Sequence, residues 1–319
     1  MKDRLGREID YIRISITDRC NLRCGYCMPG CGVPSVSHDM ILRFDEIVRL
    51  VKIFCSLGIK NVKITGGEPL VRRGAVGLIK EIKSIDGVEK VSMTTNGILL
   101  SENLEALAEA GVDSINISLD TLNRQKYLNI TGYDGLDAVL KAVDRCRHFP
   151  DIKLKINTVT LADYNRDEIC ALADLAATAG ARLRFIEIMP IGLGAGFGGY
   201  DQDETMAVLE KAYGPAKTID QKIGNGPAQY YKFEKLGTDI GFISPMSHKF
   251  CQSCNRIRLT SEGMLRLCLG SDEGIDLRGP MRNGAGDEEL AVIIKSGIYN
   301  KPSGHCFKTT DTLMSKIGG

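Results

Sequence analysis

Short runs of β-branched residues alternate with longer amphipathic stretches from residue 10 to residue 190. A short apolar run between turn signals predicts a buried strand, whereas apolar residues three and four apart predict a helix. The predicted strands are Tyr11–Thr17, Asn61–Thr65, Lys90–Thr95, Asp113–Leu119, Lys153–Thr160 and Arg182–Met189. The predicted helices are Phe44–Leu57, Ala75–Ile85, Ser101–Ala110, Leu136–His148 and Asp167–Ala179.

Six strand–helix units at a spacing of roughly thirty residues predict a parallel sheet with right-handed crossovers. A closed barrel of eight units needs two more units and about 250 residues. We therefore expect an α/β fold, an open, partial TIM-type (β/α)6 barrel over residues 1–190. Residues 191–319 begin with the glycine-rich stretch Gly192–Gly199 and lose the regular alternation. We expect them to form a C-terminal region packed over or beside the barrel.

Composition excludes several classes of function. Lysine and arginine total 41 against 40 acidic residues, so no net field favours nucleic acid or an anionic membrane. No apolar run approaches the roughly eighteen residues of a membrane span. The polar N-terminus Met1–Asp10 is unlike a secretion signal, and we expect a cytoplasmic protein. Eleven cysteines, an odd number, favour metal or redox use over disulfides.

The first group of cysteines comes directly after the first predicted strand. Cys20, Cys24 and Cys27 have the pattern CxxxCxxC. Three thiolates on one loop can bind one face of an iron–sulfur cubane, and a set of three leaves one iron open. Zinc is the alternative, with Cys31 as the fourth ligand. The isolated cysteines are interpreted as small buried residues: Cys55, Cys146, Cys170 and Cys306.

Glycine and polar residues follow the next three predicted strands. Gly66-Gly67-Glu68-Pro69 closes the second strand, Asn96 the third, and Ser118-Leu119-Asp120 the fourth. Carboxyl ends of parallel strands meet at one edge, so we expect these residues near the first cysteine group. The glycines let the backbone approach a ligand, and Glu68 could hold a cationic group. A plain turn is the alternative interpretation of the glycine segment.

The second group consists of Cys251 and Cys254, with Cys268 after thirteen intervening residues. A zinc site would need a further ligand such as His248. Arg256 and Arg258 follow the pair and alternate on a strand-like run, so their side chains share one face. Two guanidinium groups suit a phosphate or carboxylate, and a solvated basic face is the alternative.

Both cysteine groups resemble known families. The first, with Tyr26 before its third cysteine, resembles the signature of the radical S-adenosylmethionine (SAM) superfamily. The second, with its R-x-R sequence, resembles the auxiliary cluster site of the MoaA family of GTP 3′,8-cyclases. That resemblance covers nearly the whole chain, in the segments Asp3–Arg7, Arg13–Cys20, Ile64–Pro69, Ser118–Asp120, Arg184–Met189 and Gly318-Gly319.

The resemblance implies a role for particular residues. It implies two [4Fe-4S] clusters, one held by Cys20, Cys24 and Cys27, and one in the C-terminal region held by Cys251, Cys254 and Cys268. It implies SAM contacts from Tyr26, Gly67, Ser118 and Met189. It implies GTP contacts from Arg13, Lys63, Thr94, Lys155, Arg256, Ile257 and Arg258. It implies catalytic roles for Arg256, Arg258, Gly318 and Gly319. Relatives commonly have arginine at position 63, so Lys63 keeps the charge but loses a bidentate contact.

The reaction implied is a SAM-dependent radical cyclisation of GTP, the first step of molybdenum cofactor biosynthesis. A 5′-deoxyadenosyl radical abstracts the ribose 3′ hydrogen, and the sugar radical adds to C8 of a guanine held on the second cluster. Reduction and protonation give (8S)-3′,8-cyclo-7,8-dihydroguanosine 5′-triphosphate. The family also implies a low-potential electron donor, cyclic pyranopterin monophosphate synthase (MoaC) as the next enzyme, and a homodimer.

Basic residues on predicted strands agree with an anionic substrate. Arg13, Lys63, Lys155 and Arg184 lie where side chains should be buried, and a buried cation needs an anionic partner. One triphosphate could neutralise several of them; pairing with internal acids such as Glu187 is the alternative. Two other classes compete: a peptide-modifying radical SAM enzyme, and a zinc or iron–sulfur protein that binds nucleic acid. The first leaves the basic residues unexplained, and the neutral net charge opposes the second.

Overall fold

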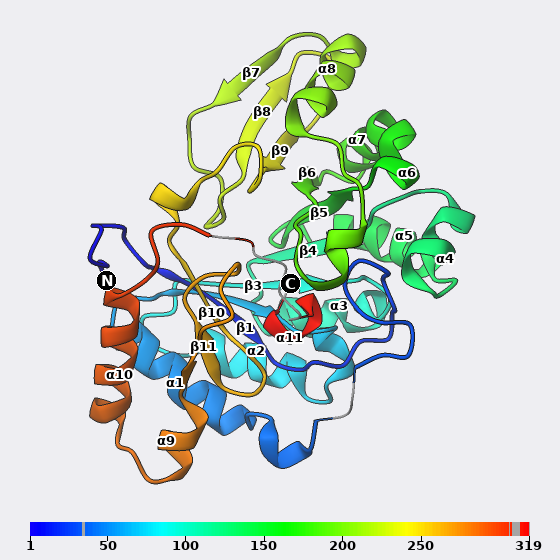
Figure 1. The fold of residues 1–319 in the computed structure, drawn as a ribbon. Helices are drawn as coiled ribbons and strands as arrows, with labels where there is room; N and C mark the ends of the chain where they lie inside the picture. The colour runs from blue at the N-terminus through cyan, green and yellow to red at the C-terminus, as the bar shows by residue number, and fades with distance from the viewer. Residues whose placement is uncertain (34–35, 306, 308–312, 319) are drawn as a thin grey trace.

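The computed structural model describes residues 1–33, 36–305, 307 and 313–318. Within them, one twelve-stranded sheet has the order β12-β11-β10-β1-β2-β3-β4-β5-β6-β9-β8-β7 (Figure 1). The strands are β1 (Tyr11–Ser15), β2 (Asn61–Thr65), β3 (Lys90–Thr95), β4 (Ser114–Ser118), β5 (Lys153–Thr160), β6 (Arg182–Glu187), β7 (Ala216–Ile219), β8 (Gln229–Phe233), β9 (Asp239–Ile243), β10 (Arg256–Leu259), β11 (Met264–Arg266) and β12 (Ile275–Asp276). The helices are α1 (Phe44–Ser56), α2 (Ala75–Lys83), α3 (Leu100–Glu109), α4 (Arg124–Thr131), α5 (Leu136–Arg145), α6 (Ala162–Asn165), α7 (Ile169–Thr178), α8 (Gln202–Tyr213), α9 (Arg278–Arg282), α10 (Asp287–Tyr299) and α11 (Met314–Ile317). No helix among these residues is long and apolar enough to cross a membrane.

The predicted α/β fold with a parallel sheet is confirmed. Strands β1 to β6 follow the order of the sequence, and each pairs parallel with the next. Helices α1, α2, α3, α5 and α7 correspond to the predicted helices. Helix α4 was not predicted, because its polar sequence RQKYLNIT shows no clear helical period. The Asn123 side chain caps its first turn, and Gly132 ends it in a left-handed conformation.

The C-terminal region extends the sheet at both ends. Strand β9 pairs parallel with β6, and β10 pairs parallel with β1, which gives eight neighbouring parallel strands. The antiparallel strands β7, β8, β11 and β12 flank them. Among the described strands β9 and β10 do not pair with each other, so the parallel arc is open. The C-terminal region thus contributes strands to the arc, whereas the sequence predicted only packing over or beside it.

The two faces of the parallel strands differ in polarity. Along β1, the side chains of Ile12 and Ile14 lie in the hydrophobic core, while those of Arg13 and Ser15 alternate with them toward the other side. Helices α1 to α7 lie around the outside of the strands, and the β7–β8 hairpin projects from one end (Figure 1). The polar inner face of the arc is therefore left to enclose a site.

Candidate functional site

A cavity of about 320 Å³ lies inside the arc. Residues from all eight parallel strands line it, from Ile243 of β9 at one end to Arg256 of β10 at the other. Both ends of an open sheet can reach one cavity only if the sheet curves strongly, as in a barrel. The six cysteines of the two groups line this same cavity, although the groups lie far apart in sequence.

The two cysteine groups enter the cavity from opposite ends of the strands. Cys20 follows the carboxyl end of β1, as the sequence predicts. Cys254 precedes β10, and β10 runs parallel to β1, so the second group lies at the amino ends of the strands. The barrel interior therefore separates the groups, and a ligand bound in the cavity can lie between them.

The first cysteine loop is a tight, half-buried turn with donors directed at sulfur. The Cys27 backbone N–H donates to the Cys24 carbonyl at 2.8 Å. The Cys20 sulfur accepts from the Leu22 N–H at 3.4 Å and from Asn96 Nδ2 at 3.7 Å. Burial, followed by repulsion from neighbouring thiolates, raises the pKa of Cys24 well above its usual value and that of Cys27 to about 12. Coordination to cationic iron would offset both effects, because a metal-bound thiol loses its proton.

Helix α4 supports the first cysteine loop. The Arg23 N–H donates to the Thr131 carbonyl at 2.7 Å, and the Gly25 N–H donates to the Ile130 carbonyl at 2.9 Å. The last turn of α4 thus holds the middle of the loop through its otherwise unsatisfied carbonyls. This role of α4 was not evident from the sequence, because it depends on backbone groups.

The glycine pair after β2, Gly66-Gly67, packs against the backbone that leads into the first cysteine loop, and a larger residue would not fit there. The Gly67 N–H donates to the Thr17 carbonyl at 2.7 Å, and a Cβ at position 67 would lie 2.3 Å from the Arg19 oxygen. Both glycines also line the cavity. Glu68 was expected to be able to hold a cationic group, but its carboxylate is occupied by neutral donors of the protein. It is 1% exposed, and its carboxylate accepts from the Thr95 hydroxyl and the Asn96 N–H.

The four residues predicted to contact SAM all line the cavity: Tyr26, Gly67, Ser118 and Met189. The Tyr26 hydroxyl donates to Asp120 Oδ2 at 2.6 Å, and the Val159 N–H donates to Asp120 Oδ1 at 2.8 Å. Burial raises the pKa of Asp120 to about 6. Asp120 therefore fixes the Tyr26 ring beside the cysteine loop and joins it to β5.

The second cysteine group lies in a basic environment. Burial opposes ionisation of Cys254, but the charges of Arg256 and Lys301 lower its pKa to about 7. Lys301 is 2% exposed, and its ammonium group donates to the Arg256 carbonyl at 2.8 Å and to the Leu267 carbonyl. Lys301 was not singled out from the sequence, because it is an isolated lysine after α10 that only the tertiary fold brings to the cysteines.

The side chains described near the cysteines do not form a compact zinc site. His248, the fourth ligand considered from the sequence, is exposed and does not line the cavity. Among the described residues, no three cysteine, histidine or acidic side chains are grouped closely enough for a single metal ion. The thiolates of a cubane bind different irons and stand farther apart. Cys31 is exposed and outside the cavity wall, and Cys146 is buried in the core.

Five cations on strands β10, β1, β2 and β6 line the cavity: Arg13, Lys63, Arg184, Arg256 and Arg258. Burial and then the charges of Arg184, Arg13 and Lys155 lower the pKa of Lys63 well below its usual value. In the described part of the chain, no carboxylate forms an ion pair with Lys63, Lys155, Arg184 or Arg258. Glu187, the acid considered as a partner, instead accepts from the N–H groups of Met246 and Ser247. The cavity therefore has excess positive charge that a polyanion could neutralise.

Two residues predicted to contact GTP are not part of the cavity wall. Ile257 is fully buried in the core, because it lies between Arg256 and Arg258 and faces the opposite side of β10. Its side chain cannot contact a ligand in the cavity, so only its backbone could do so. Lys155 is buried and is not among the residues that line the cavity; burial and then Arg184 lower its pKa to about 8. Thr94 lines the cavity as expected.

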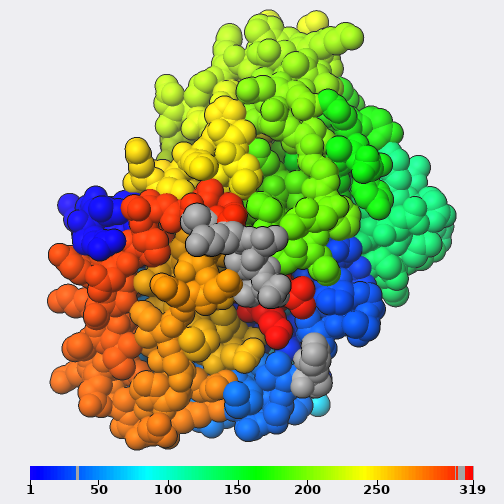
Figure 2. Space-filling model, in the orientation of Figure 1, coloured from blue at the N-terminus to red at the C-terminus, as the bar shows by residue number. Residues whose placement is uncertain are grey.

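The C-terminal tail enters the site. Met314 and Ser315 of α11 line the cavity, and the Gly318 carbonyl accepts from Arg258 Nη1 at 2.5 Å. Gly318 has a φ of 71°, and a Cβ there would lie 2.7 Å from the Thr65 hydroxyl. Figure 2 shows this red segment in the centre of the face, between blue N-terminal and orange C-terminal residues. Gly319 and Cys306, also named from the sequence, lie outside the described residues.

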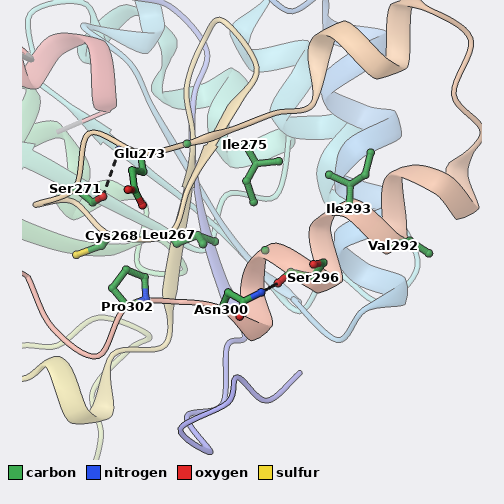
Figure 3. Close-up of a pocket in the computed structure, with 12 residues that line it drawn as sticks. Leu267, Cys268, Ser271, Glu273, Ile275, Val292, Ile293, Ser296, Asn300 and Pro302 are labelled. Carbon is green, nitrogen blue, oxygen red and sulfur yellow. Dashed lines mark hydrogen bonds between the residues drawn. The ribbon is translucent and has the colours of Figure 1, made fainter.

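A separate groove of about 750 Å³ lies beside α10 (Figure 3). Its lining includes Leu267, Ile275 and Val292, and it carries no cluster of cations like that of the inner cavity. Cys268 is shared by the walls of the groove and the cavity.

Comparison with known proteins gives consistent matches along the whole chain. The model of the radical SAM superfamily matches residues 14–176, and that of Molybdenum Cofactor Synthesis C matches residues 181–307. A GTP 3′,8-cyclase of Clostridium perfringens (strain 13 / Type A) is 48% identical over 327 residues, which is 100% of both chains. Molybdenum cofactor biosynthesis protein 1 of Dictyostelium discoideum is 40% identical over 96% of this chain and 49% of its own length. SuiB of Streptococcus suis, solved with bound SAM, has a TM-score of 0.67 at 15% identity, over 94% of this chain and 73% of that one.

Proposed function

The chain belongs to the radical SAM superfamily and, within it, to the family of the GTP 3′,8-cyclases, and from this premise we propose that it cyclises GTP. The product would be the 3′,8-cyclised nucleotide that begins molybdenum cofactor biosynthesis. The observation that carries the proposal is the cluster of buried cations inside a cavity that also contains both cysteine groups. A nucleoside triphosphate has the charge for the cations and the length to lie between the groups.

The first three cysteines fit a [4Fe-4S] cluster, because they share one half-buried loop with N–H donors directed at Cys20. Cys251, Cys254 and Cys268 fit a second cluster, since neighbouring cations already favour the thiolate of Cys254. The first cluster with SAM would supply a 5′-deoxyadenosyl radical when bound. Tyr26, Gly67, Ser118 and Met189 line the wall where SAM would lie.

The cationic residues would hold and orient the substrate. Arg13, Lys63 and Arg184 would bind phosphate oxygens from β1, β2 and β6, with Lys155 behind them. Such fixed contacts would hold the ribose in one position and exclude water. A substrate oriented in this way has a lower barrier to reaction. Arg256 and Arg258 lie beside the second cysteine group, where guanine would bind; Thr94 and the Ile257 backbone would complete the contacts.

The C-terminal tail would complete the catalytic site. The Gly318 carbonyl bonds to Arg258, one of the cavity cations, and could fix that guanidinium group for the substrate. Gly319 lies outside the described residues, and its role is proposed from the family resemblance. We assign catalytic roles to Arg256, Arg258 and the two glycines on this ground.

The remaining expectations follow from the family and are part of the proposal. We divide the chain at residue 190 into a radical SAM barrel and a C-terminal region with the second cluster. The enzyme would be a cytoplasmic homodimer that receives electrons from a low-potential donor. Its product would pass to cyclic pyranopterin monophosphate synthase. No nucleic-acid or membrane partner is expected.

An anaerobic reconstitution tests the proposal. Purified protein is loaded with iron and sulfide, iron is counted, and SAM, dithionite and GTP are added. We expect about eight irons per chain, as two cubanes require, and GTP-dependent formation of 5′-deoxyadenosine and the cyclised nucleotide. SAM cleavage that GTP leaves unchanged would instead favour the peptide-modifying alternative. Tightly bound zinc without SAM cleavage would refute the whole assignment.

A further inference from the structure

The connection between β7 and β8 closes the amino-terminal end of the open arc. The hairpin projects from the sheet, and the connection turns back toward it (Figure 1). Gly226 and Pro227 line the cavity together with Arg13 and Lys63. We call residues 224–227 the floor segment.

Two hydrogen bonds join the floor segment to the amino ends of strands, and a third holds one of its partners, Asn255. Asn225 Nδ2 donates to the Asn61 side chain, at the start of β2, at 2.8 Å. The Asn225 carbonyl accepts from Asn255 Nδ2, directly before β10, at 3.2 Å. Asn255 Nδ2 also donates to Asp10 Oδ1 at 2.6 Å. The segment therefore bridges the strands on one side of the opening that the missing β9–β10 pairing leaves.

The floor segment lies against the cation cluster. Gly224 has a φ of 76°, and a Cβ there would lie 3.3 Å from Lys155 Nζ. The backbone N–H groups of Gly224 and Gly226 donate to no acceptor among the described residues, so they are available to a ligand. Backbone N–H groups without an acceptor can bind phosphate oxygens, and cations beside them favour the same ligand. The arrangement combines a closed wall, buried cations and unused donors at one end of the cavity.

We propose that the floor segment is the specificity element for the phosphate chain and selects a nucleoside triphosphate over the diphosphate. The proposal rests on the proposed function and adds the segment to its site. A closed floor keeps water from Lys63 and Lys155, so a short phosphate chain leaves these cations unneutralised. A site rejects the wrong ligand when binding that ligand leaves desolvated charges unpaired. Opening the floor would hydrate the cations and reduce this discrimination.

Equilibrium dialysis under anaerobic conditions tests the proposal, with GTP and GDP as the probes. The variant Asn225→Ala removes the bond to Asn61, and Gln221→Ala, an exposed position in the same connection, is the matched control. For wild type and control we expect GTP to bind at least about tenfold more tightly than GDP, or about 1.4 kcal/mol. For Asn225→Ala we expect this ratio to fall at least about fivefold, mainly through weaker GTP binding, with SAM binding and iron content unchanged.

The possible results test the role of the floor segment separately from the proposed function. An unchanged GTP/GDP ratio in Asn225→Ala refutes the role of the floor segment while the proposed function stands. Wild type that binds neither nucleotide refutes the proposed function itself. If Asn225→Ala fails to load iron, Gly224→Ala replaces it, because its methyl group would displace Lys155 and lower the same ratio.

Discussion

Arg7 connects the N-terminal segment to the second cysteine group, and its removal should destabilise that group selectively. Its guanidinium group donates to the carbonyls of Cys251 at 2.9 Å and Pro302 at 2.6 Å, and further to those of Lys301 and Ser303. Arg7 Nε also forms an ion pair with Asp3 at 2.6 Å, and the two side chains are 5% and 0% exposed. The perturbation is Arg7→Met, which keeps an unbranched apolar side chain and removes every donor.

The expected cost follows from burial. Removing one partner of a buried ion pair leaves the other charge without compensation and costs about 3–5 kcal/mol. The lost bonds to carbonyls belong to the same group and are not additive with this value. A loss of about 3–5 kcal/mol is a large part of the roughly 5–15 kcal/mol that stabilises a typical domain. Because Arg7 holds the Cys251 backbone, the second cluster should be lost before the first.

Denaturant unfolding and iron analysis measure these effects. For Arg7→Met we expect a lower unfolding midpoint and about four irons per chain rather than about eight, with SAM binding retained. Arg4→Met is the control, because Arg4 is exposed and its side chain forms no hydrogen bond in the described structure. Adding Asp3→Asn to Arg7→Met should recover part of the lost stability. If Arg7→Met equals Arg4→Met in both measurements, the buried contacts do not hold the loop and the reasoning is wrong.

Three further predictions concern the cavity. Gly67→Ala places a methyl group 2.3 Å from the Arg19 carbonyl oxygen, so we expect the iron of the first cluster and SAM cleavage to be lost, as iron analysis and 5′-deoxyadenosine assays will show. Lys155 has a pKa lowered by burial to about 8, so its cationic form decreases as pH rises through 8. GTP affinity should fall over that range in wild type and less in Lys155→Arg, whose guanidinium group stays charged, when dialysis is run from pH 7 to 9.5. Lys63→Met removes a buried cation from a repulsive cluster, so we expect the unfolding free energy to rise by about 1–3 kcal/mol while GTP binds at least about tenfold more weakly.

Each of these predictions has a contradicting result. Gly67→Ala with normal iron content would show that the two backbones can move apart without loss of the site. An equally steep decline of GTP affinity in Lys155→Arg would assign the pH dependence to another group. Lys63→Met with lower stability would show that the cation is already compensated in the substrate-free protein.

The sequence alone determined the parts of this protein that depend on local pattern. The period of apolar residues gave strands β1 to β6 and five helices, because each element is short and its pattern is complete within itself. The spacing of Cys20, Cys24 and Cys27 likewise defines a ligand set within one loop. All four SAM positions named from the family resemblance line one cavity, because the carboxyl ends of parallel strands meet.

Only the tertiary structure decided the features that depend on pairing between distant segments. Nothing in the local sequence of β9 or β10 shows that each joins an edge of the parallel sheet, yet that pairing places Cys254 at the amino ends of the strands. Lys301, Arg7 and the floor segment acquire their contacts from the same long-range arrangement. The burial of the Ile257 side chain in the core and the donors around Glu68 were likewise not evident from the sequence, since side-chain direction and neighbouring donors are fixed only once the strands pair. A ligand motif such as the first cysteine loop consists of nearby residues and is visible in the sequence. The shape and charge of the cavity arise from contacts between distant segments, which no short segment contains.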